Sequence, residues 1–346
     1  MCTTLLITAK DGAVVSGRTM EFGFDLESEV MVIPAGTPMT GTLPNDAKGI
    51  NYSTKYGMLG ANALDFPVIV DGINEKGLFF SALYFPGYAE FADVTPLNAL
   101  HAMAPHELGN WLLGTCADVE EVRGRLGDIV LVKTTVEALG GPAPLHYIVR
   151  DASGKSLVIE PLGGELQVYD NLVGVMTNSP TFDWHLTNLS NYRGLTALNV
   201  GSVVLGGNFP LPQFGQGSGM IGLPGDSTPP SRFIRAVAYS QTVLPTDSGA
   251  DAVLQVFHIM NCFDIPVGSV REMGDKQLHT DYTIWTSVAD LKSNRWYFRT
   301  YNDQSIRMVD LHKALEAAGS KVRFISMNSV QPIVVTSTDF KPANPK

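Results

Sequence analysis

Residues 1–21 read MCTTLLITAKDGAVVSGRTME, and this stretch has the pattern of a β-hairpin. Two β-rich runs, 3–9 and 13–20, flank the pair Asp11-Gly12, which is a strong signal for a tight turn between antiparallel strands. Because the register of a hairpin follows from its turn, this pair also predicts which residues face one another across the two strands.

With Asp11-Gly12 as a two-residue loop, paired positions sum to 23, so Cys2 is predicted opposite Glu21 and Leu5 opposite Arg18. Arg18 and Glu21 are three residues apart, and a regular strand points them to opposite faces. Bringing both side chains to Cys2 therefore requires a bulge or bend near 19–20.

Cys2 becomes the first residue if Met1 is removed, and its small side chain permits that trimming. The new α-amino group has an unperturbed pKa of about 7.7–8.0, so a useful fraction is neutral near pH 7 and can act as a base. A nearby Arg18 favours the thiolate, and Glu21 is placed to orient the amine. One residue then supplies nucleophile and base; the alternative is an ordinary second residue that happens to be cysteine.

The rest of the chain alternates blocks of strands with blocks of helices, which indicates the α+β class. Strands are predicted between 68 and 84 around a turn at 74–77, and at 145–150, 157–160, 166–169, 282–290, 295–301 and 306–311. Helices are predicted at 104–115, 117–126, 181–192, 230–242 and 249–261. The Gly- and Pro-rich stretch 201–230 is also apolar, and we interpret it as an ordered loop over the core.

Net charge, cysteine content and the lengths of apolar runs exclude several classes of function. The formal net charge is −10, with 24 Lys and Arg against 34 Asp and Glu, so nucleic acid and anionic membrane are disfavoured as partners. Three cysteines, Cys2, Cys116 and Cys262, are too few and uneven for a disulfide framework. No apolar run approaches the roughly 18 residues of a membrane span. As written, the chain is expected in the cytoplasm, or in the periplasm if a signal peptide was removed.

Other site patterns are weak. Residues 217–222 fit the dinucleotide pattern G-x-G-x-x-G, but no strand precedes them and no helix follows. The seven histidines show no metal spacing, since His101 and His106 are five apart and do not share a helical face well. The sequence therefore predicts neither a metal nor a cofactor.

Eight short motifs occur in one order along the chain, and together they closely resemble the choloylglycine hydrolase family of conjugated bile salt hydrolases and penicillin V acylases. They are MCTT (1–4), GRTME (17–21), GINEKGL (72–78), FPGYA (85–89), MTNSPTF (176–182), LPGD (223–226), SRF (231–233) and YTIWTS (282–287). The resemblance extends to about Leu311. It implies a four-layer αββα N-terminal-nucleophile fold, often a homotetramer, with one amide-hydrolase domain over 2–346. Met1 is expected to be removed, and about 312–346 to form a C-terminal extension.

The resemblance also implies roles for matching residues. Cys2 matches the nucleophile, and Arg18 matches the residue that stabilises its thiolate. Glu21 stands where the family usually shows Asp beside the free amine, a departure that lengthens the side chain by one methylene. Asn178 matches the side-chain donor of the oxyanion hole, and the backbone N–H of Tyr84 is expected to be the second donor.

Further expectations concern a second catalytic arginine, the substrate preference and the acyl pocket. Arg232 matches the second active-site arginine, with Arg235 one turn on as the competing choice. At the position of Tyr84, bile-salt-cleaving members tend to carry Asn and penicillin-V-cleaving members tend to carry Tyr. The candidates for an apolar acyl pocket are Met20, Phe22, Phe24, Met58 and Phe66.

The sequence therefore predicts an amide hydrolase that acts on N-acyl compounds with an apolar acyl part. Tyr84 makes penicillin V the preferred substrate, with conjugated bile salts as the close alternative and N-acyl homoserine lactones as a third. A small-molecule substrate is the only partner predicted besides further copies of the chain. The non-enzyme alternative is an unprocessed or binding-only homologue, because a retained Met1 turns the α-amine of Cys2 into an amide nitrogen and removes the base.

Overall fold

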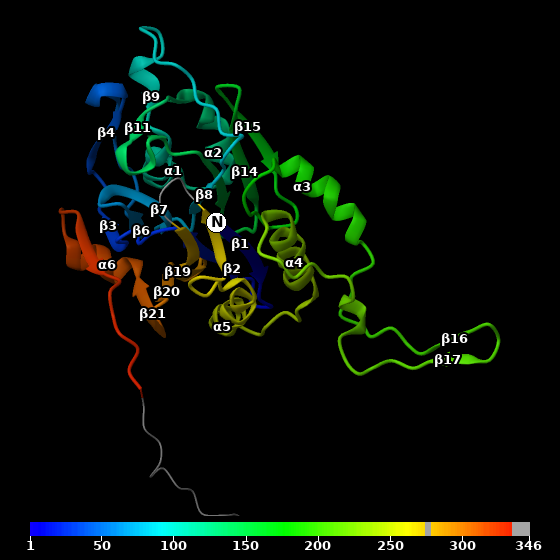
Figure 1. Ribbon diagram of the computed structural model, residues 1–346. Coiled ribbons are helices and arrows are strands. Elements are labelled where there is room, and N and C mark those ends of the chain that lie inside the picture. The colour runs from blue at the N-terminus through cyan, green and yellow to red at the C-terminus, as the bar shows by residue number, and fades with distance from the viewer. Residues whose placement is uncertain (274–277, 334–346) are drawn as a thin grey trace, which may run out of the picture.

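The computed structural model describes residues 1–273 and 278–333, and two large β-sheets form its centre (Figure 1). The first sheet has the order β1-β2-β19-β20-β21, with β18 paired to β19. Its strands are β1 (Cys2–Thr8), β2 (Val14–Phe22), β18 (Val270–Met273), β19 (Leu278–Asp290), β20 (Arg295–Thr300) and β21 (Asp303–Asp310). The N-terminal hairpin thus forms one edge of this sheet.

The second sheet has the order β15-β14-β13-β8-β7-β6-β3-β22 within the described residues. Its strands are β3 (Glu29–Ile33), β6 (Met58–Ala63), β7 (Phe66–Asn74), β8 (Phe79–Tyr84), β13 (Leu145–Arg150), β14 (Ser156–Leu162), β15 (Glu165–Asp170) and β22 (Arg323–Ser326). All neighbouring strands pair antiparallel.

Four two-stranded sheets and six α-helices complete the described part of the chain. The small sheets pair β4 (Pro38–Thr42) with β5 (Lys48–Ser53), β9 (Ala102–Met103) with β10 (Val130–Leu131), β11 (Thr135–Val136) with β12 (Gly141–Pro142), and β16 (Val203–Leu205) with β17 (Phe209–Leu211). The helices are α1 (Leu108–Thr115), α2 (Val119–Arg125), α3 (Phe182–Leu189), α4 (Pro229–Thr242), α5 (Gly249–Met260) and α6 (Leu311–Ala318).

The elements stack in four layers. Helix α5 packs on the outer face of the first sheet, so closely that a Cβ on Gly17 would lie 2.3 Å from Val256. Helix α1 packs on the second sheet, where a Cβ on Gly109 would lie 2.3 Å from the carbonyl of Ile69. One core cluster joins the two sheets, and another joins the second sheet to α1 and α2. This arrangement is the αββα fold that the resemblance implied.

The predicted helices and strands are present with small shifts of their ends. Helix α2, for example, begins after Asp118, whose carboxylate accepts a hydrogen bond from the backbone N–H of Glu121 (2.9 Å). Strands β3 to β6 and helix α6 were not predicted. The segment expected as a C-terminal extension contributes α6 and the edge strand β22, which pairs with β3. No helix of the described residues is long and apolar enough to span a membrane.

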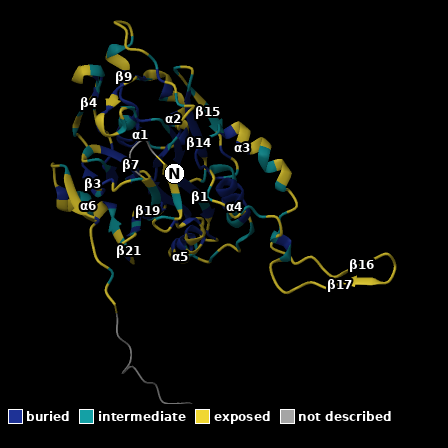
Figure 2. Ribbon diagram, in the orientation of Figure 1, coloured by how far each residue is buried: buried dark blue, intermediate teal, exposed yellow. Residues whose placement is uncertain are grey.

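The prediction of an apolar loop over the core at 201–230 is wrong for its first half. Strands β16 and β17 form a hairpin that projects away from the body of the molecule, and its residues are exposed (Figures 1 and 2). Phe209 is 64% exposed and Phe214 fully exposed. Hydrophobicity alone does not say which surface buries an apolar residue, so the sequence pattern does not distinguish this hairpin from the core.

Candidate active site

The turn between β1 and β2 has three loop residues, 10–12, where the sequence predicted two. Ala9 donates a backbone hydrogen bond to the carbonyl of Ala13 (2.9 Å), and Gly12 takes φ of +81°, a conformation that glycine adopts without steric cost. Paired positions therefore sum to 22 instead of 23.

This register corrects both predicted pairs, because Cys2 lies opposite Met20 and Leu5 lies opposite Gly17. Residues opposite each other share a face of the sheet, and so do residues two apart in a strand. The side chains of Cys2, Met20 and Arg18 consequently lie on one face. No bulge near Met20 is needed: the pairing of β1 with β2 is continuous, and the irregularity belongs to the pairing of β2 with β19.

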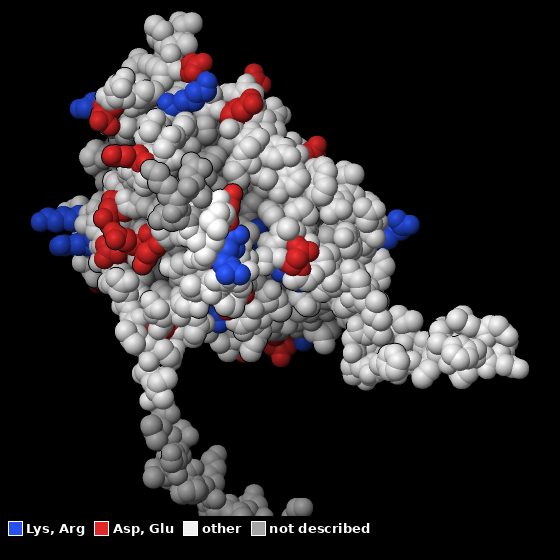
Figure 3. All heavy atoms as spheres, in the orientation of Figure 1, with Lys and Arg blue, Asp and Glu red and all other residues white. Residues whose placement is uncertain are grey.

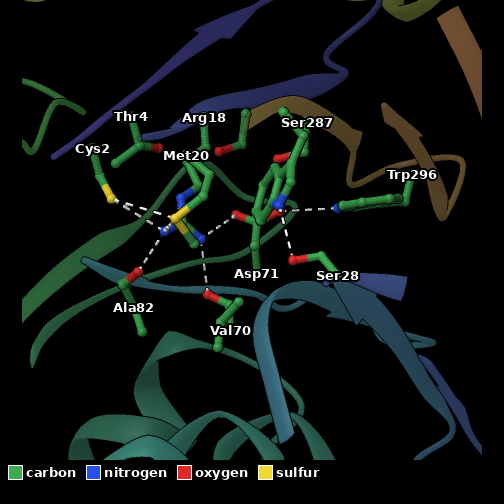
Figure 4. Close-up of polar contacts among 12 residues, drawn as sticks. Cys2, Thr4, Arg18, Met20, Ser28, Val70, Asp71, Ala82, Ser287 and Trp296 are labelled. Atoms are coloured by element: carbon green, nitrogen blue, oxygen red, sulfur yellow. Dashed lines mark hydrogen bonds and ion pairs between the residues drawn. The ribbon is translucent and has the colours of Figure 1, made fainter. Parts of the chain in front are cut away.

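Arg18 lies against the thiol of Cys2 in the space between the sheets (Figure 4). Its Nη2 is 3.3 Å from Cys2 Sγ and 3.4 Å from Met20 Sδ. The guanidinium also donates to the carbonyls of Ala82 (2.8 Å) and Val70 (3.1 Å), which belong to the second sheet. Both Arg18 and Cys2 are buried, so a positive charge is held beside the sulfur away from bulk water.

Asp71 on β7 lies behind Arg18 and was missed by the sequence analysis. Its Oδ2 is 3.8 Å from Arg18 Nη1, and its Oδ1 accepts from Ser287 Oγ (2.7 Å) and Trp296 Nε1 (3.1 Å). Burial raises the pKa of Asp71, whereas the charge of Arg18 and these hydrogen bonds act to lower it. A carboxylate inside the apolar run 68–73 was the available signal, because a fully buried acid needs a partner.

Asn178 holds the main chain of Cys2 from the other side. Its Oδ1 accepts from the backbone N–H of Cys2 (2.8 Å) and from Arg232 Nη2 (2.7 Å). Its Nδ2 donates to the carbonyl of Tyr84 (2.6 Å). Asn178 therefore joins the first residue of β1 to the last residue of β8.

The structure distinguishes the two arginines of α4. The fully buried Arg232 donates to the carbonyl of Cys2 and to Thr3 Oγ1 (2.7 Å). Arg235 instead donates to the carbonyl of Asp226 (2.7 Å) in the loop before the helix. Only Arg232 of this pair reaches the N-terminal strand.

Glu21 approaches from the opposite face of β2 to the Cys2 thiol. Its Oε1 accepts from Thr283 Oγ1 (3.3 Å), and its main chain pairs with that of Met1. Burial raises the pKa of Glu21, and the positive charge of Arg232 is the largest influence in the other direction. Within the described residues, the carboxylate of Glu21 makes no hydrogen bond to Cys2.

Two buried histidines fix the main chain at 177–178. His185 Nε2 is 2.8 Å from the carbonyl of Asn178, and His146 Nε2 is 3.0 Å from the carbonyl of Thr177. The second ring nitrogen of His146 lies 3.2 Å from Glu160. Burial lowers the pKa of His185 to about 4, so its ring is neutral near pH 7 and donates through Nε2.

The low pKa of His185 predicts a loss of stability in acid. An unfolded histidine takes up a proton near pH 6.5, whereas the folded one does so only near 4, so unfolding becomes easier as the pH falls between these values. Over this pH range the free energy of unfolding should fall by roughly 3 kcal/mol. Urea unfolding at pH 7.5 and 4.5 should show a smaller loss for His185→Gln than for the unchanged protein; equal losses would contradict the assignment.

A cavity of about 80 Å³ lies beside Cys2, and its wall is almost entirely apolar. Met20, Phe66 and Tyr84, three of the predicted substrate-binding residues, line it. Phe22 also contributes, with its ring edge-on to that of Tyr84 at 5.6 Å between centroids. Such a wall suits an apolar, partly aromatic group bound next to the thiol.

Two candidates for the acyl pocket lie elsewhere. Phe24 is 40% exposed and packs edge-on against Phe22, outside the lining of the cavity. Met58 is buried in the cluster between the second sheet and α1, so it belongs to the core. In the described part of the chain, no group of three or more His, Cys, Asp and Glu side chains is placed to hold a metal ion.

Comparison with known proteins agrees with this geometry. The profile of the linear amide C–N hydrolases of the choloylglycine hydrolase family matches residues 2–322. The bile salt hydrolase/transferase of Clostridium perfringens is 34% identical over 315 residues, which is 90% of this chain and 93% of that protein. The penicillin V acylase of Pectobacterium atrosepticum is 26% identical over 355 residues, covering 96% and 87% of the two chains.

A solved structure extends this similarity to three dimensions. The mutant conjugated bile acid hydrolase from Clostridium perfringens superimposes with a TM-score of 0.85 at 32% identity, over 97% of this chain and all of that one. The similarity covers both sheets and the helices outside them, so it includes every element that contacts Cys2. Sequence profile and fold agree, and the chain therefore belongs to the choloylglycine hydrolase family and is a hydrolase of linear amide C–N bonds.

Proposed function

We propose that the chain is an N-terminal cysteine amidase whose nucleophile is Cys2 after removal of Met1. The observation that carries the proposal is the position of Cys2, with its sulfur 3.3 Å from Arg18 Nη2 and at the wall of an apolar cavity. Its nitrogen faces Asn178 Oδ1 at 2.8 Å, which would hold the freed amine in place.

The chemistry divides into two transfers. The thiol proton passes to the neutral α-amine of Cys2 while the sulfur attacks the carbonyl carbon of the amide. The C–N bond of the tetrahedral intermediate then breaks, and the leaving nitrogen takes the proton from the amine. A thioester remains on Cys2. Water, losing a proton to the same amine, attacks the thioester and releases the carboxylic acid and the free thiol.

Stabilisation of the oxyanion is assigned to Asn178 and Tyr84. Asn178 Nδ2 lies 2.6 Å from the carbonyl of Tyr84, at the junction of Cys2 with the cavity. In this proposal, the amide turns its N–H from that carbonyl to the oxyanion, and the backbone N–H of Tyr84 is the second donor. A donor of this kind lowers the barrier by about 2.7–4 kcal/mol in other amidases.

Penicillin V is the first candidate substrate. The almost entirely apolar wall of the cavity beside Cys2 suits an aromatic acyl group such as that of penicillin V. Tyr84 and Phe22 place aromatic rings where such a group would lie. Conjugated bile salts are an equally strong candidate, because the bile salt hydrolase/transferase shares more identity with this chain than the penicillin V acylase does.

Steady-state hydrolysis of penicillin V, glycocholate and an N-acyl homoserine lactone, measured side by side, tests this ranking. We expect the largest kcat/KM for penicillin V. A kcat/KM for glycocholate far above that for penicillin V would reverse the order of the two candidates, and hydrolysis of none of the three would contradict both.

The projecting hairpin supports assembly of several copies of the chain, for which a tetramer is the expectation. No charged residue occurs between 194 and 225, and Figure 3 shows the projection as an uncharged surface. Its exposed large apolar residues include Val204, Phe209 and Phe214. A monomer rarely leaves such an apolar patch exposed to water.

Light scattering of the unchanged protein should give a multiple of the chain mass. Replacing 200–216 by a short Gly-Ser link should reduce the measured mass. A monomer before the deletion would contradict the assembly.

A further inference from the structure

We propose that Asp71 acts on the Cys2 thiol through Arg18, because its carboxylate offsets part of the positive charge of the guanidinium beside the sulfur. This inference rests on the proposed function of Cys2, and it concerns what sets the reactivity of the sulfur. Asp71 does not itself line the cavity, and it reaches the site through Arg18, which does.

The carboxylate of Asp71 is held on both sides. Ser287 and Trp296, from neighbouring strands of the first sheet, donate to Oδ1 at 2.7 and 3.1 Å (Figure 4). Oδ2 faces Arg18 Nη1 at 3.8 Å and makes no hydrogen bond within the described residues. Since Asp71 belongs to β7 and its two donors belong to β19 and β20, the group also ties the two sheets together directly beneath the site.

Arg18 keeps its place through other contacts as well. The carbonyls of Val70 and Ala82 accept from the guanidinium, and the ring of Trp285 lies 5.0 Å from its central carbon. Loss of the carboxylate should therefore leave Arg18 beside the sulfur without its ion-pair partner Asp71. A variant without this carboxylate therefore tests the charge of Asp71 while Arg18 remains next to Cys2.

Several buried charged groups surround Arg18 and the Cys2 thiol. Arg18 and Arg150 bring two cations to the space between the sheets, and Asp71 brings one carboxylate. Burial lowers the pKa of Arg150 to about 9, and the charge of Asp71 acts against that fall. The other titratable groups facing the site are Glu21, Arg232, Tyr84, His106 and the N-terminal amine.

The Asp71→Asn variant tests the offset. With the carboxylate neutralised, Arg18 favours the thiolate more strongly, so Cys2 should reach half its maximal alkylation rate at a pH lower by about half a unit or more. The plateau rate at high pH should fall, because a more stabilised thiolate is a weaker nucleophile. Iodoacetamide labelling of the N-terminal peptide, followed by mass spectrometry, measures Cys2 separately from the exposed Cys262.

Two further variants keep the test decisive. Because neutralising a buried acid can prevent folding, Asp71→Asn needs a milder companion variant. Ser287→Ala removes one hydrogen-bond donor to Asp71 and should move the pH midpoint of Cys2 alkylation in the same direction by a smaller amount. Asp290→Asn, at another buried carboxylate whose contacts are backbone N–H groups of the following turn, should leave the midpoint unchanged.

An unchanged midpoint in both Asp71→Asn and Ser287→Ala, or a shift to higher pH in either, would overturn the role of Asp71. Alkylation does not require hydrolysis of any amide. The alkylation result is therefore independent of the proposed function. The proposed function fails if the protein hydrolyses its substrate without Cys2.

Discussion

Replacing Cys2 by alanine is expected to lower kcat for amide hydrolysis about 10⁴- to 10⁶-fold, the range seen when a covalent nucleophile is removed. Alanine is small enough to permit removal of Met1, so the α-amine and its hydrogen bond to Asn178 are retained. The variant therefore removes the sulfur and little else. Single-turnover and steady-state assays with the best substrate of the panel measure the effect.

Cys262→Ala is the matched control, because this second free thiol is exposed and lies on the turn after α5. It should hydrolyse the substrate at the rate of the unchanged protein. Hydrolysis by Cys2→Ala within about tenfold of the unchanged protein would remove Cys2 from the chemistry and with it the proposed mechanism.

A permanent N-terminal extension is expected to lower activity sharply while leaving the fold intact. The backbone of Met1 already pairs with Glu21, whose N–H donates to the Met1 carbonyl at 2.9 Å, and the Met1 amine lies 3.6 Å from Asp281. Residues before Cys2 can thus continue the strand without disturbing the sheet. The nitrogen of Cys2 would remain an amide, and loss of a general base typically costs ~10²- to 10⁴-fold.

The control for this experiment carries the same extension at the C-terminus and should keep full activity. Thermal unfolding and alkylation of the Cys2 thiol should be similar in the two proteins. Full activity with an uncleaved extension before Cys2 would show that the α-amine is not the base.

The hairpin illustrates what the sequence could and could not predict. Both strands followed from β-propensity and the Asp-Gly turn, but the register depended on one extra loop residue. Asp11 Oδ1 accepts from the backbone N–H of Ala13 (2.9 Å), which helps to close the longer loop. A change of one residue in register exchanges the faces of the strand. The predicted bulge is absent for a different reason, because Glu21 lies on the opposite face of β2 and, within the described residues, its carboxylate makes no hydrogen bond to Cys2.

The distant members of the site could be proposed only through the resemblance. Asn178 and Arg232 are 176 and 230 residues from Cys2, and no local pattern predicts that their side chains meet it. Asp71 lacked even that support, because its partner Arg18 belongs to the opposite sheet. Side-chain periodicity shows which face of a strand a residue occupies, but pairing between sheets depends on how the whole core packs.

Intact-mass analysis of the active protein, quenched with acid during turnover of its best substrate, tests the N-terminal cysteine most directly. Our account predicts a chain that lacks Met1 and carries the mass of one acyl group, which peptide mapping locates on Cys2. Turnover by a chain that retains Met1, or an acyl group attached to any other residue, would contradict it.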